Sequence, residues 1–227
     1  MKSSAVRVLL IGAAGRMGKT VLDLAQSDLE LEIAARCDLG DSIEPAMKNC
    51  DVAIDFSQAD SIDEICRAAL QHGKSLVIGT TGHSQQQRKT IEQIAHSVPV
   101  VFASNFSVGM NVLFWLARKA AEFLGPDFSA EIIETHHRMK KDAPSGTAKM
   151  LAEILKAVRS SEIPIQSIRE GDVVGEHRVM LSGPGERLEL THRAASREIF
   201  ATGALRAAKW VVGKPPKLYS MQDVLGL

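Results

Sequence analysis

A glycine-rich turn between an apolar run and an amphipathic segment constrains the fold of this chain more than any other feature. Residues 6–11 form a short continuous apolar run, typical of a strand buried in a parallel sheet. Residues 12–18 (GAAGRMG) follow at once, and residues 19–25 then carry apolar side chains at helical spacing. Strand, glycine turn and helix form the unit in which a dinucleotide pyrophosphate binds at a helix N-terminus. The spacing is G-x-x-G-x-x-G rather than the commoner G-x-G-x-x-G, so a plain tight turn is the alternative.

A carboxylate in the right place favours the cofactor interpretation. Asp38 ends a second apolar run, residues 31–37, and lies 20 residues past Gly18. At this position a carboxylate accepts hydrogen bonds from the adenosine ribose. A carboxylate also repels the 2′-phosphate of NADPH, so Asp38 followed by Leu39 favours NADH. Arg16 or Arg36 could still reach such a phosphate.

The alternation of strands and helices continues to about residue 124. Residues 40–50 between them are short and polar. Gly79, Thr80 and Thr81 follow the fourth strand, where small residues let a cofactor approach the carboxyl edge of a parallel sheet, although a plain glycine turn is again possible. The expected elements are a strand and its exit at residues 51–57, strands at 75–78 and 98–102, and helices at 61–71, 84–96 and 112–124.

The pattern changes after residue 125. A strand at residues 129–135 and a helix at 146–159 precede strand-like segments at 163–169, 173–181 and 187–192, and a last helix spans 196–212. Strands that follow one another without helices indicate a mixed or antiparallel sheet. The predicted fold is therefore α/β, with an N-terminal Rossmann dinucleotide-binding domain and a C-terminal α+β domain containing an open mixed sheet. We expect the first domain at 1–107 plus 198–227 and the substrate-binding and oligomerisation domain at 108–197.

A basic loop that enters a helix suggests an anion site in the second domain. His136, His137, Lys140 and Lys141 precede Ser145, where the helix is expected to begin. The unpaired N–H groups and partial positive charge of a helix N-terminus bind small anions such as a dicarboxylate or a phosphate. The alternatives are a solvated basic loop with Ser145 as an ordinary cap, or, less favoured, a metal site, for which the ligand pattern is missing.

Composition excludes several classes of partner. The 27 basic and 27 acidic residues balance, and aromatic residues make up only 4%, which argues against nucleic acid and anionic membranes. The three cysteines, Cys37, Cys50 and Cys66, are widely spaced, as expected of a reduced cytoplasmic protein. No apolar run approaches the ~18 residues of a membrane span, and the N-terminal apolar stretch is too short for a signal peptide.

Residues 134–148 (ETHHRMKKDAPSGTA) closely resemble the signature E-x-H-H-x-x-K-x-D-A-P-S-G-T-A of the 4-hydroxy-tetrahydrodipicolinate reductase (dihydrodipicolinate reductase) family. The GAAGRMG turn, residues 55–57 (DFS) and residues 103–111 (ASNFSVGMN) also resemble segments of that family. The resemblance covers nearly the whole chain, with shortenings near 40–50 and 160–170, so the chain looks like a short-form member.

The resemblance implies reduction of 4-hydroxy-tetrahydrodipicolinate to tetrahydrodipicolinate by NADH or NADPH, on the diaminopimelate–lysine pathway, without a metal. His136 and Lys140 match the family's proton-transfer residues, and cationic neighbours would lower the proton affinity of Lys140. His137, Gly146 and Thr147 match its substrate contacts. The family also implies a homotetramer packed through the C-terminal sheet. The cofactor contacts would be Gly12, Gly15, Arg16, Met17, Gly18, Asp38, Gly79, Thr80, Thr81, Ser104, Asn105 and Phe106.

Two other functions compete with this one. Another Rossmann-type amino-acid or aldehyde dehydrogenase would need a catalytic Cys or His elsewhere, and none of the three cysteines is suitably placed. A non-enzymatic NAD-binding sensor would need a DNA-binding or partner surface, which the neutral charge does not offer.

Overall fold

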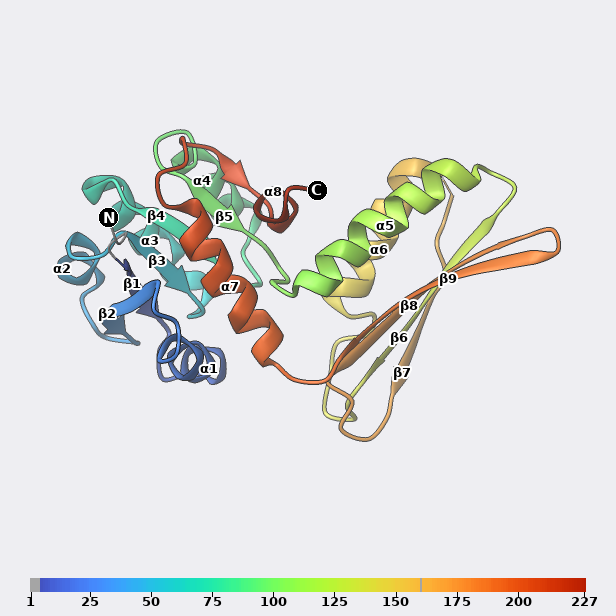
Figure 1. Cartoon of the computed structure of the whole chain (residues 1–227), viewed down its shortest axis with the longest axis horizontal. Coiled ribbons are helices and arrows are strands. Elements are labelled where there is room, and N and C mark those ends of the chain that lie inside the picture. The colour runs from blue at the N-terminus through green and yellow to red at the C-terminus, as the bar shows by residue number, and fades with distance from the viewer. Residues whose placement is uncertain (1–4, 160) are drawn as a thin grey trace. The chain divides into compact units, whose positions relative to one another are not determined.

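The structure, a computed structural model, describes residues 5–159 and 161–227. It divides into two compact units, one extending to Ser107 and completed by Glu198–Leu227, the other formed by Val108–Arg197. Each unit builds its own sheet and its own apolar core (Figure 1).

The first unit contains a six-stranded sheet in the order β10-β5-β4-β3-β1-β2, in which every pair of neighbours is parallel. The chain runs from β1 outwards to β2 and then returns to the other side of β1, which places a topological switch point there. This arrangement confirms the predicted Rossmann fold. The strands are β1 (Val6–Ile11), β2 (Leu31–Cys37), β3 (Val52–Asp55), β4 (Ser75–Ile78), β5 (Val100–Phe102) and β10 (Leu218–Tyr219).

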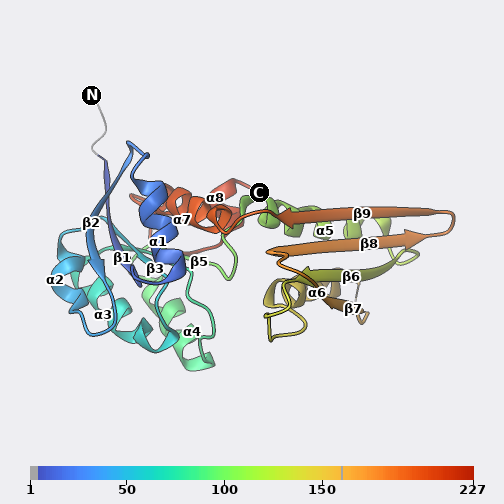
Figure 2. The same cartoon turned by 90° about the horizontal axis from the view of Figure 1, so that it is seen from below.

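Helices cover both faces of this sheet, as Figure 2 shows. Successive side chains of a strand point to opposite faces, so Val8 and Leu10 pack under one helical layer and Leu9 and Ile11 under the other. The first layer comprises α1 (Arg16–Ala25), α7 (Glu198–Val211) and α8 (Met221–Leu225). The second comprises α2 (Ile43–Lys48), α3 (Ile62–His72), which the short turn η1 (Ala59–Ser61) precedes, and α4 (Gln85–Ile94).

Two local details differ from the sequence analysis. The connection at residues 40–50, for which no element was predicted, contains α2, because Ile43 and Met47, one helical turn apart, are both buried. The helix expected from residue 112 begins a turn earlier, at Val108.

The second unit is a mixed sheet in the order β7-β6-β8-β9, with β6 parallel to β7 and the other pairs antiparallel (Figure 2). One face packs against two helices, since Ile132 of β6 and Val179 of β8, which are register partners, share a core with Leu113 and Leu151. The elements are α5 (Val108–Leu124), β6 (Ser129–His136), α6 (Gly146–Arg159), β7 (Ile165–Arg169), β8 (Gly175–Gly183) and β9 (Glu186–Ala194).

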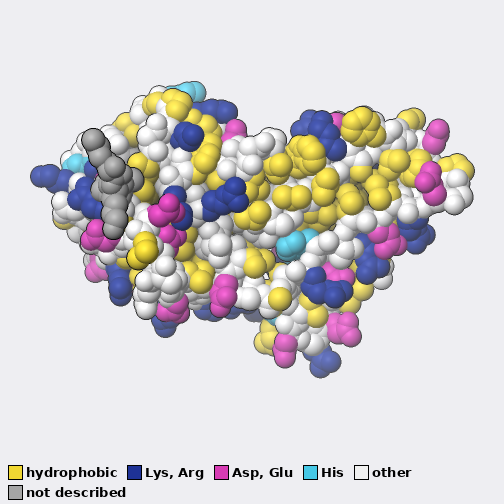
Figure 3. Space-filling view, viewed as in Figure 1, with side chains coloured by type: hydrophobic (Ala, Val, Ile, Leu, Met, Phe, Trp, Pro, Cys, Tyr) yellow, Lys and Arg dark blue, Asp and Glu magenta, His cyan; other side chains and the backbone are white. Residues whose placement is uncertain are grey.

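Hydrophobic side chains gather along the outer side of α5 (Figure 3), where Leu116 and Phe123 are exposed. Despite this apolar surface, none of the helices in the described part of the chain has both the length and the hydropathy needed to cross a membrane.

Candidate active site

The glycine turn of the first unit brings the start of α1 close to the end of β3. Gly12 has a φ of +82°, and a Cβ at this residue would lie 2.5 Å from the carbonyl oxygen of Phe56. Only glycine tolerates both conditions. Gly15 is the N-cap of α1 and has no side chain to cap it. The first N–H groups of α1 therefore adjoin a turn of bare backbone, which is how an anion is bound at a helix N-terminus.

Asp38 lies directly beside this turn. Its two carboxylate oxygens are 2.9 and 3.1 Å from the backbone nitrogen of Ala14, which donates to them. The backbone N–H of Asp38 donates to Asp41 at 2.8 Å. Asp38, Asp41 and Glu64 line a cavity of about 250 Å³ together with Gly12 and Gly15.

Among the described residues that line this cavity, every charged side chain is acidic. Arg16 and Arg36, which were considered as possible phosphate ligands, are exposed and do not line it.

The other predicted cofactor residues lie within α1 or beyond the carboxyl ends of β4 and β5. In α1, Met17 packs on the core and Gly18 is buried. After β4, the N–H groups of Gly79 and Thr80 donate to the carbonyl oxygen of Asp55 at 2.9 and 3.2 Å, and Thr81 is exposed.

After β5, Ser104 is exposed, and the side-chain oxygen of Asn105 accepts from the N–H of Ser107 at 2.9 Å. The side chain of Phe106 is buried and packs edge-on to Phe56 at a centroid distance of 6.1 Å, so only its backbone could meet a ligand.

In the second unit, β6 ends at His136 and continues into the basic loop. The loop is held to its own unit by backbone bonds, from His137 N–H to Val173 O at 2.7 Å and from Arg138 N–H to Gly171 O at 3.2 Å. Lys140 Nζ lies 2.8 Å from Asp142 Oδ1. The lysine therefore has an acidic partner as well as the expected cations, and its ammonium group lowers the pKa of the Asp142 carboxyl.

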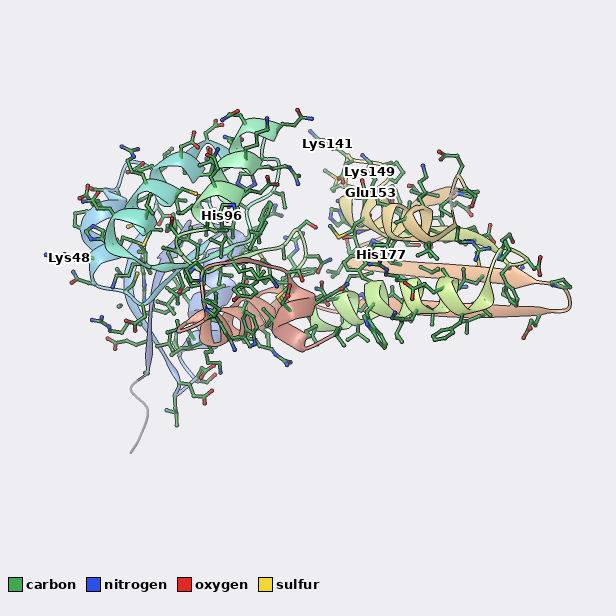
Figure 4. The ribbon with its side chains drawn as sticks, turned by 90° about the horizontal axis from the view of Figure 1, so that it is seen from above. Lys48, His96, Lys141, Lys149, Glu153 and His177 are labelled. Carbon is green, nitrogen blue, oxygen red and sulfur yellow. The ribbon has the colours of Figure 1, made fainter. Side chains whose placement is uncertain are left out.

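The basic loop leads directly to the start of α6, as predicted (Figure 4 marks Lys141 in the loop and Lys149 in the helix). Ser145 is buried, and its hydroxyl accepts the N–H of Ala148 at 3.2 Å, so it caps the helix. Gly146 is exposed, and a Cβ there would meet nothing within 4 Å. Gly146 and Thr147 thus begin a helix whose N-terminus has free space beside it.

Behind the loop lies a buried polar cluster that the sequence analysis did not identify. Glu134 is completely buried and contacts Nδ1 of His136 through Oε2. Arg169 of β7 donates to both oxygens of Glu134, at 3.0 and 2.8 Å. Nε2 of His177 in β8 lies 3.2 Å from the hydroxyl of Ser145. The signal was available, because Glu134 and His136 are two residues apart on a strand and must share a face.

Burial and pairing set the charge of this cluster. Burial alone would raise the pKa of Glu134, but the Arg169 guanidinium and neighbouring donors lower it to about 2. Burial lowers the pKa of His136, partly offset by Glu134. Burial also lowers the pKa of His177, to about 4. The cluster is therefore an ionised Glu–Arg pair beside two neutral histidines at neutral pH.

Two family models together match almost the entire chain. The model described as the N-terminus of dihydrodipicolinate reductase matches residues 6–106, and the model described as its C-terminus matches residues 109–225. The chain belongs to the dihydrodipicolinate reductase family. It is therefore an oxidoreductase, as predicted, and the family decides against the alternative of another amino-acid or aldehyde dehydrogenase.

Individual relatives agree. The 4-hydroxy-tetrahydrodipicolinate reductase of Akkermansia muciniphila is 46% identical over 98% of this chain and 98% of its own. That of Methanoculleus marisnigri is 42% identical over 98% of this chain and 100% of its own. In fold, the chain resembles the dipicolinate-bound dihydrodipicolinate reductase of Paenisporosarcina sp. TG-14, with a TM-score of 0.84 and 23% identity over 96% of this chain and 98% of that one.

Among the residues that the structure describes, no group of three or more His, Cys, Asp or Glu side chains is placed to hold a metal ion.

Proposed function

We propose that this enzyme reduces the cyclic imine formed from 4-hydroxy-tetrahydrodipicolinate by loss of water, giving tetrahydrodipicolinate for diaminopimelate and lysine biosynthesis. The observation that carries the proposal is the basic loop leading to the open N-terminus of α6 in a chain of this family. A site of this kind suits a small dicarboxylate. The dipicolinate named in the Paenisporosarcina structure belongs to the same chemical class.

The reaction needs a hydride and a proton. NADH or NADPH supplies the hydride when bound, and the protein supplies orientation and charge. We assign the proton transfer to His136, the last residue of β6, and to Lys140 in the loop that follows it. The ion pair with Asp142 holds the side chain of Lys140 in place, and an ammonium group can act as a general acid. The proton that Lys140 loses is then restored from solvent.

We assign the substrate carboxylates to His137, Gly146 and Thr147. The backbone N–H groups of Gly146 and Thr147 lie in the first turn of α6, where the helix dipole favours a negative charge. His137 is half-buried in the loop that precedes it. The exposed Arg138 and Lys141 add positive charge that would attract a dianion.

We assign the cofactor to the carboxyl edge of the parallel sheet. The pyrophosphate would lie at Gly12, Gly15, Arg16, Met17 and Gly18, where α1 begins. The ribose would lie at Asp38, in the acidic cavity. The remaining contacts would come from the ends of β4 and β5, at Gly79, Thr80, Thr81, Ser104, Asn105 and the backbone of Phe106.

One assay tests the activity directly. The substrate is generated in place from pyruvate and aspartate semialdehyde, and the oxidation of NADH is followed by absorbance. We expect turnover only when both precursors and their condensing enzyme are present. Oxidation at the same rate without the cyclic substrate would refute the proposal.

We predict that NADH is preferred over NADPH, because Asp38, Asp41 and Glu64 line the cavity. Repulsion between a carboxylate and a nearby phosphate dianion costs on the order of 1 kcal/mol in water. Asp41→Asn and Glu64→Gln should therefore each raise kcat/KM for NADPH roughly fivefold, with NADH little changed.

The matched control for the coenzyme preference is Asp23→Asn, which removes an equal charge from an exposed position on α1. It should leave the ratio of the two kcat/KM values unchanged. Wild-type enzyme that uses NADPH at least tenfold better than NADH would contradict the interpretation of Asp38.

We further propose that the enzyme is a homotetramer packed through the uncovered face of the second sheet. Strand alternation puts Met180 on that face, where it is almost fully buried. Glu176 on the same face forms ion pairs with Arg178 and Arg193. A second copy could bury this flat surface further. Light scattering after gel filtration should give four times 24.6 kDa, and Arg178→Glu, which reverses one charge of the face, should give a smaller species. A monomeric wild-type protein would contradict the proposal.

We also assign the enzyme to the cytoplasm, where its three cysteines, all free and buried, would stay reduced.

A further inference from the structure

Glu134 is the best-connected side chain of the polar cluster behind the basic loop. No part of it is exposed, and both of its oxygens are occupied. Oε1 accepts from Arg169 Nη2 at 2.8 Å and from the backbone N–H of Ser145 at 3.2 Å. Oε2 accepts from Arg169 Nη1 at 3.0 Å and contacts Nδ1 of His136. A buried carboxylate with these donors remains an acceptor on every side.

That acceptor determines which nitrogen of His136 carries the proton. An ionised carboxylate has no hydrogen to give, so the contact between Glu134 and His136 is a hydrogen bond only when Nδ1 bears the proton. In a neutral imidazole the other nitrogen, Nε2, then has the free lone pair. Nε2 is therefore the only ring nitrogen of His136 that can accept or release a proton while the bond to Glu134 is kept.

The surroundings of the ring limit its orientation, and a side chain at Gly175 would crowd Nε2. Gly175 of β8 lies beside it, and a Cβ at Gly175 would come within 3.1 Å of Nε2 and 3.4 Å of Cδ2. The His177 ring packs edge-on to the ring of His136, with centroids 5.1 Å apart.

We propose that Glu134 is a positioning residue that locks His136 in the Nδ1–H tautomer and so leaves Nε2 as its proton-transferring atom, with Arg169 holding the carboxylate in place. Arg169 is itself anchored, because its guanidinium also donates to the carbonyl oxygens of Ile168 and Asp142, at 2.7 and 2.6 Å. The proposal rests on the proton-transfer role proposed above for His136.

The two ends of the ion pair should act on His136 in opposite directions. The charged or titratable groups that face its ring are Glu134 on the same strand, Arg169 on β7, His177 on β8 and Lys140 in the loop. Glu134→Gln removes the anion, so the pKa of His136 should fall. Arg169→Gln removes a cation, so it should rise. Opposite shifts would show that both charges act on the ring, and the tautomer itself separates a positioning role from a purely structural one.

The experiment measures the ¹⁵N chemical shifts of the His136 ring as a function of pH in protein without ligands, alongside kcat and KM. Wild-type protein should show the Nδ1–H tautomer. In Glu134→Gln, Arg169 and Ser145 still require the amide oxygen, which turns the NH₂ group towards Nδ1 and favours the Nε2–H tautomer. We expect kcat to fall on the order of 10²-fold, with KM for NADH within twofold.

Two further variants keep the experiment decisive. Glu134→Gln leaves Arg169 buried without its anionic partner, which endangers folding. The double variant Glu134→Gln with Arg169→Gln removes both charges. It should also lose the preference for the Nδ1–H tautomer. The matched control is Glu153→Gln, an exposed carboxylate in α6 (Figure 4), which should change neither the tautomer nor kcat.

The outcomes separate this proposal from the proposed function. An Nε2–H tautomer in wild-type protein, or shifts of equal sign in the two single variants, would overturn the role of Glu134. A low kcat in His136→Ala beside a normal kcat in Glu134→Gln would overturn only the proposal made here. A normal kcat in His136→Ala would overturn the proton-transfer role, and this proposal with it.

Discussion

Replacing Lys140 by alanine should lower kcat by roughly 10²- to 10⁴-fold, the range for loss of a general acid or base. The reason is chemical, since hydride addition to an unsaturated ring leaves a site that must be protonated. In the structure Lys140 is three-quarters buried and paired with Asp142 at 2.8 Å, which holds it within the loop. Steady-state kinetics with the generated substrate measure the effect, and binding of NADH, followed by fluorescence, should be unchanged.

A second ion pair on the same unit provides the control. Lys156 in the last turn of α6 pairs with Glu162 at 2.6 Å and is more exposed than Lys140. Lys156→Ala removes the same charge and should leave kcat within about twofold, because surface pairs contribute little. Unaltered turnover in Lys140→Ala would remove the role assigned to that lysine.

Replacing Gly203 by alanine should destabilise the first unit by about 3 kcal/mol or more. Gly203 is buried in α7, and a Cβ there would overlap the carbonyl oxygen of Phe106 and come within 2.8 Å of its carbonyl carbon. A backbone atom cannot turn aside as a side chain can, so the helix or the segment after β5 must shift, at the upper end of the cost of overpacking. Chemical denaturation measures the loss, with the fluorescence of Trp210 in the first unit as the signal and Trp115 of the second unit replaced by phenylalanine in both proteins.

The sign of this effect makes it diagnostic. Glycine to alanine within a helix ordinarily stabilises by up to about 1 kcal/mol, because alanine is the better helix former. The neighbouring Thr202 is exposed on the same helix, and Thr202→Ala should change the free energy of unfolding by no more than about 0.5 kcal/mol. A Gly203→Ala protein as stable as wild type would show that α7 can move away from Phe106.

The sequence was sufficient to predict the features that consist of contiguous residues. Strand, glycine turn and helix are contiguous, so their identity and the acidic residue near the end of β2 could be recognised without coordinates. The basic loop and the start of α6 are contiguous too. The short helix α2 was missed, because two buried side chains among polar neighbours give too weak a periodic signal.

The order of motifs along the chain was enough to predict a Rossmann unit followed by a mixed sheet. The resemblance of residues 134–148 to a family signature was enough to indicate a dihydrodipicolinate reductase. Only the tertiary structure decided which distant residues complete those features. Arg169 reaches Glu134 across 35 residues of sequence because β7 pairs in parallel with β6. Gly203 meets Phe106 because the chain returns to the first unit after building the second. Local residue spacing does not determine which strands pair or which helices pack, because both depend on the surfaces that the whole chain can bury together.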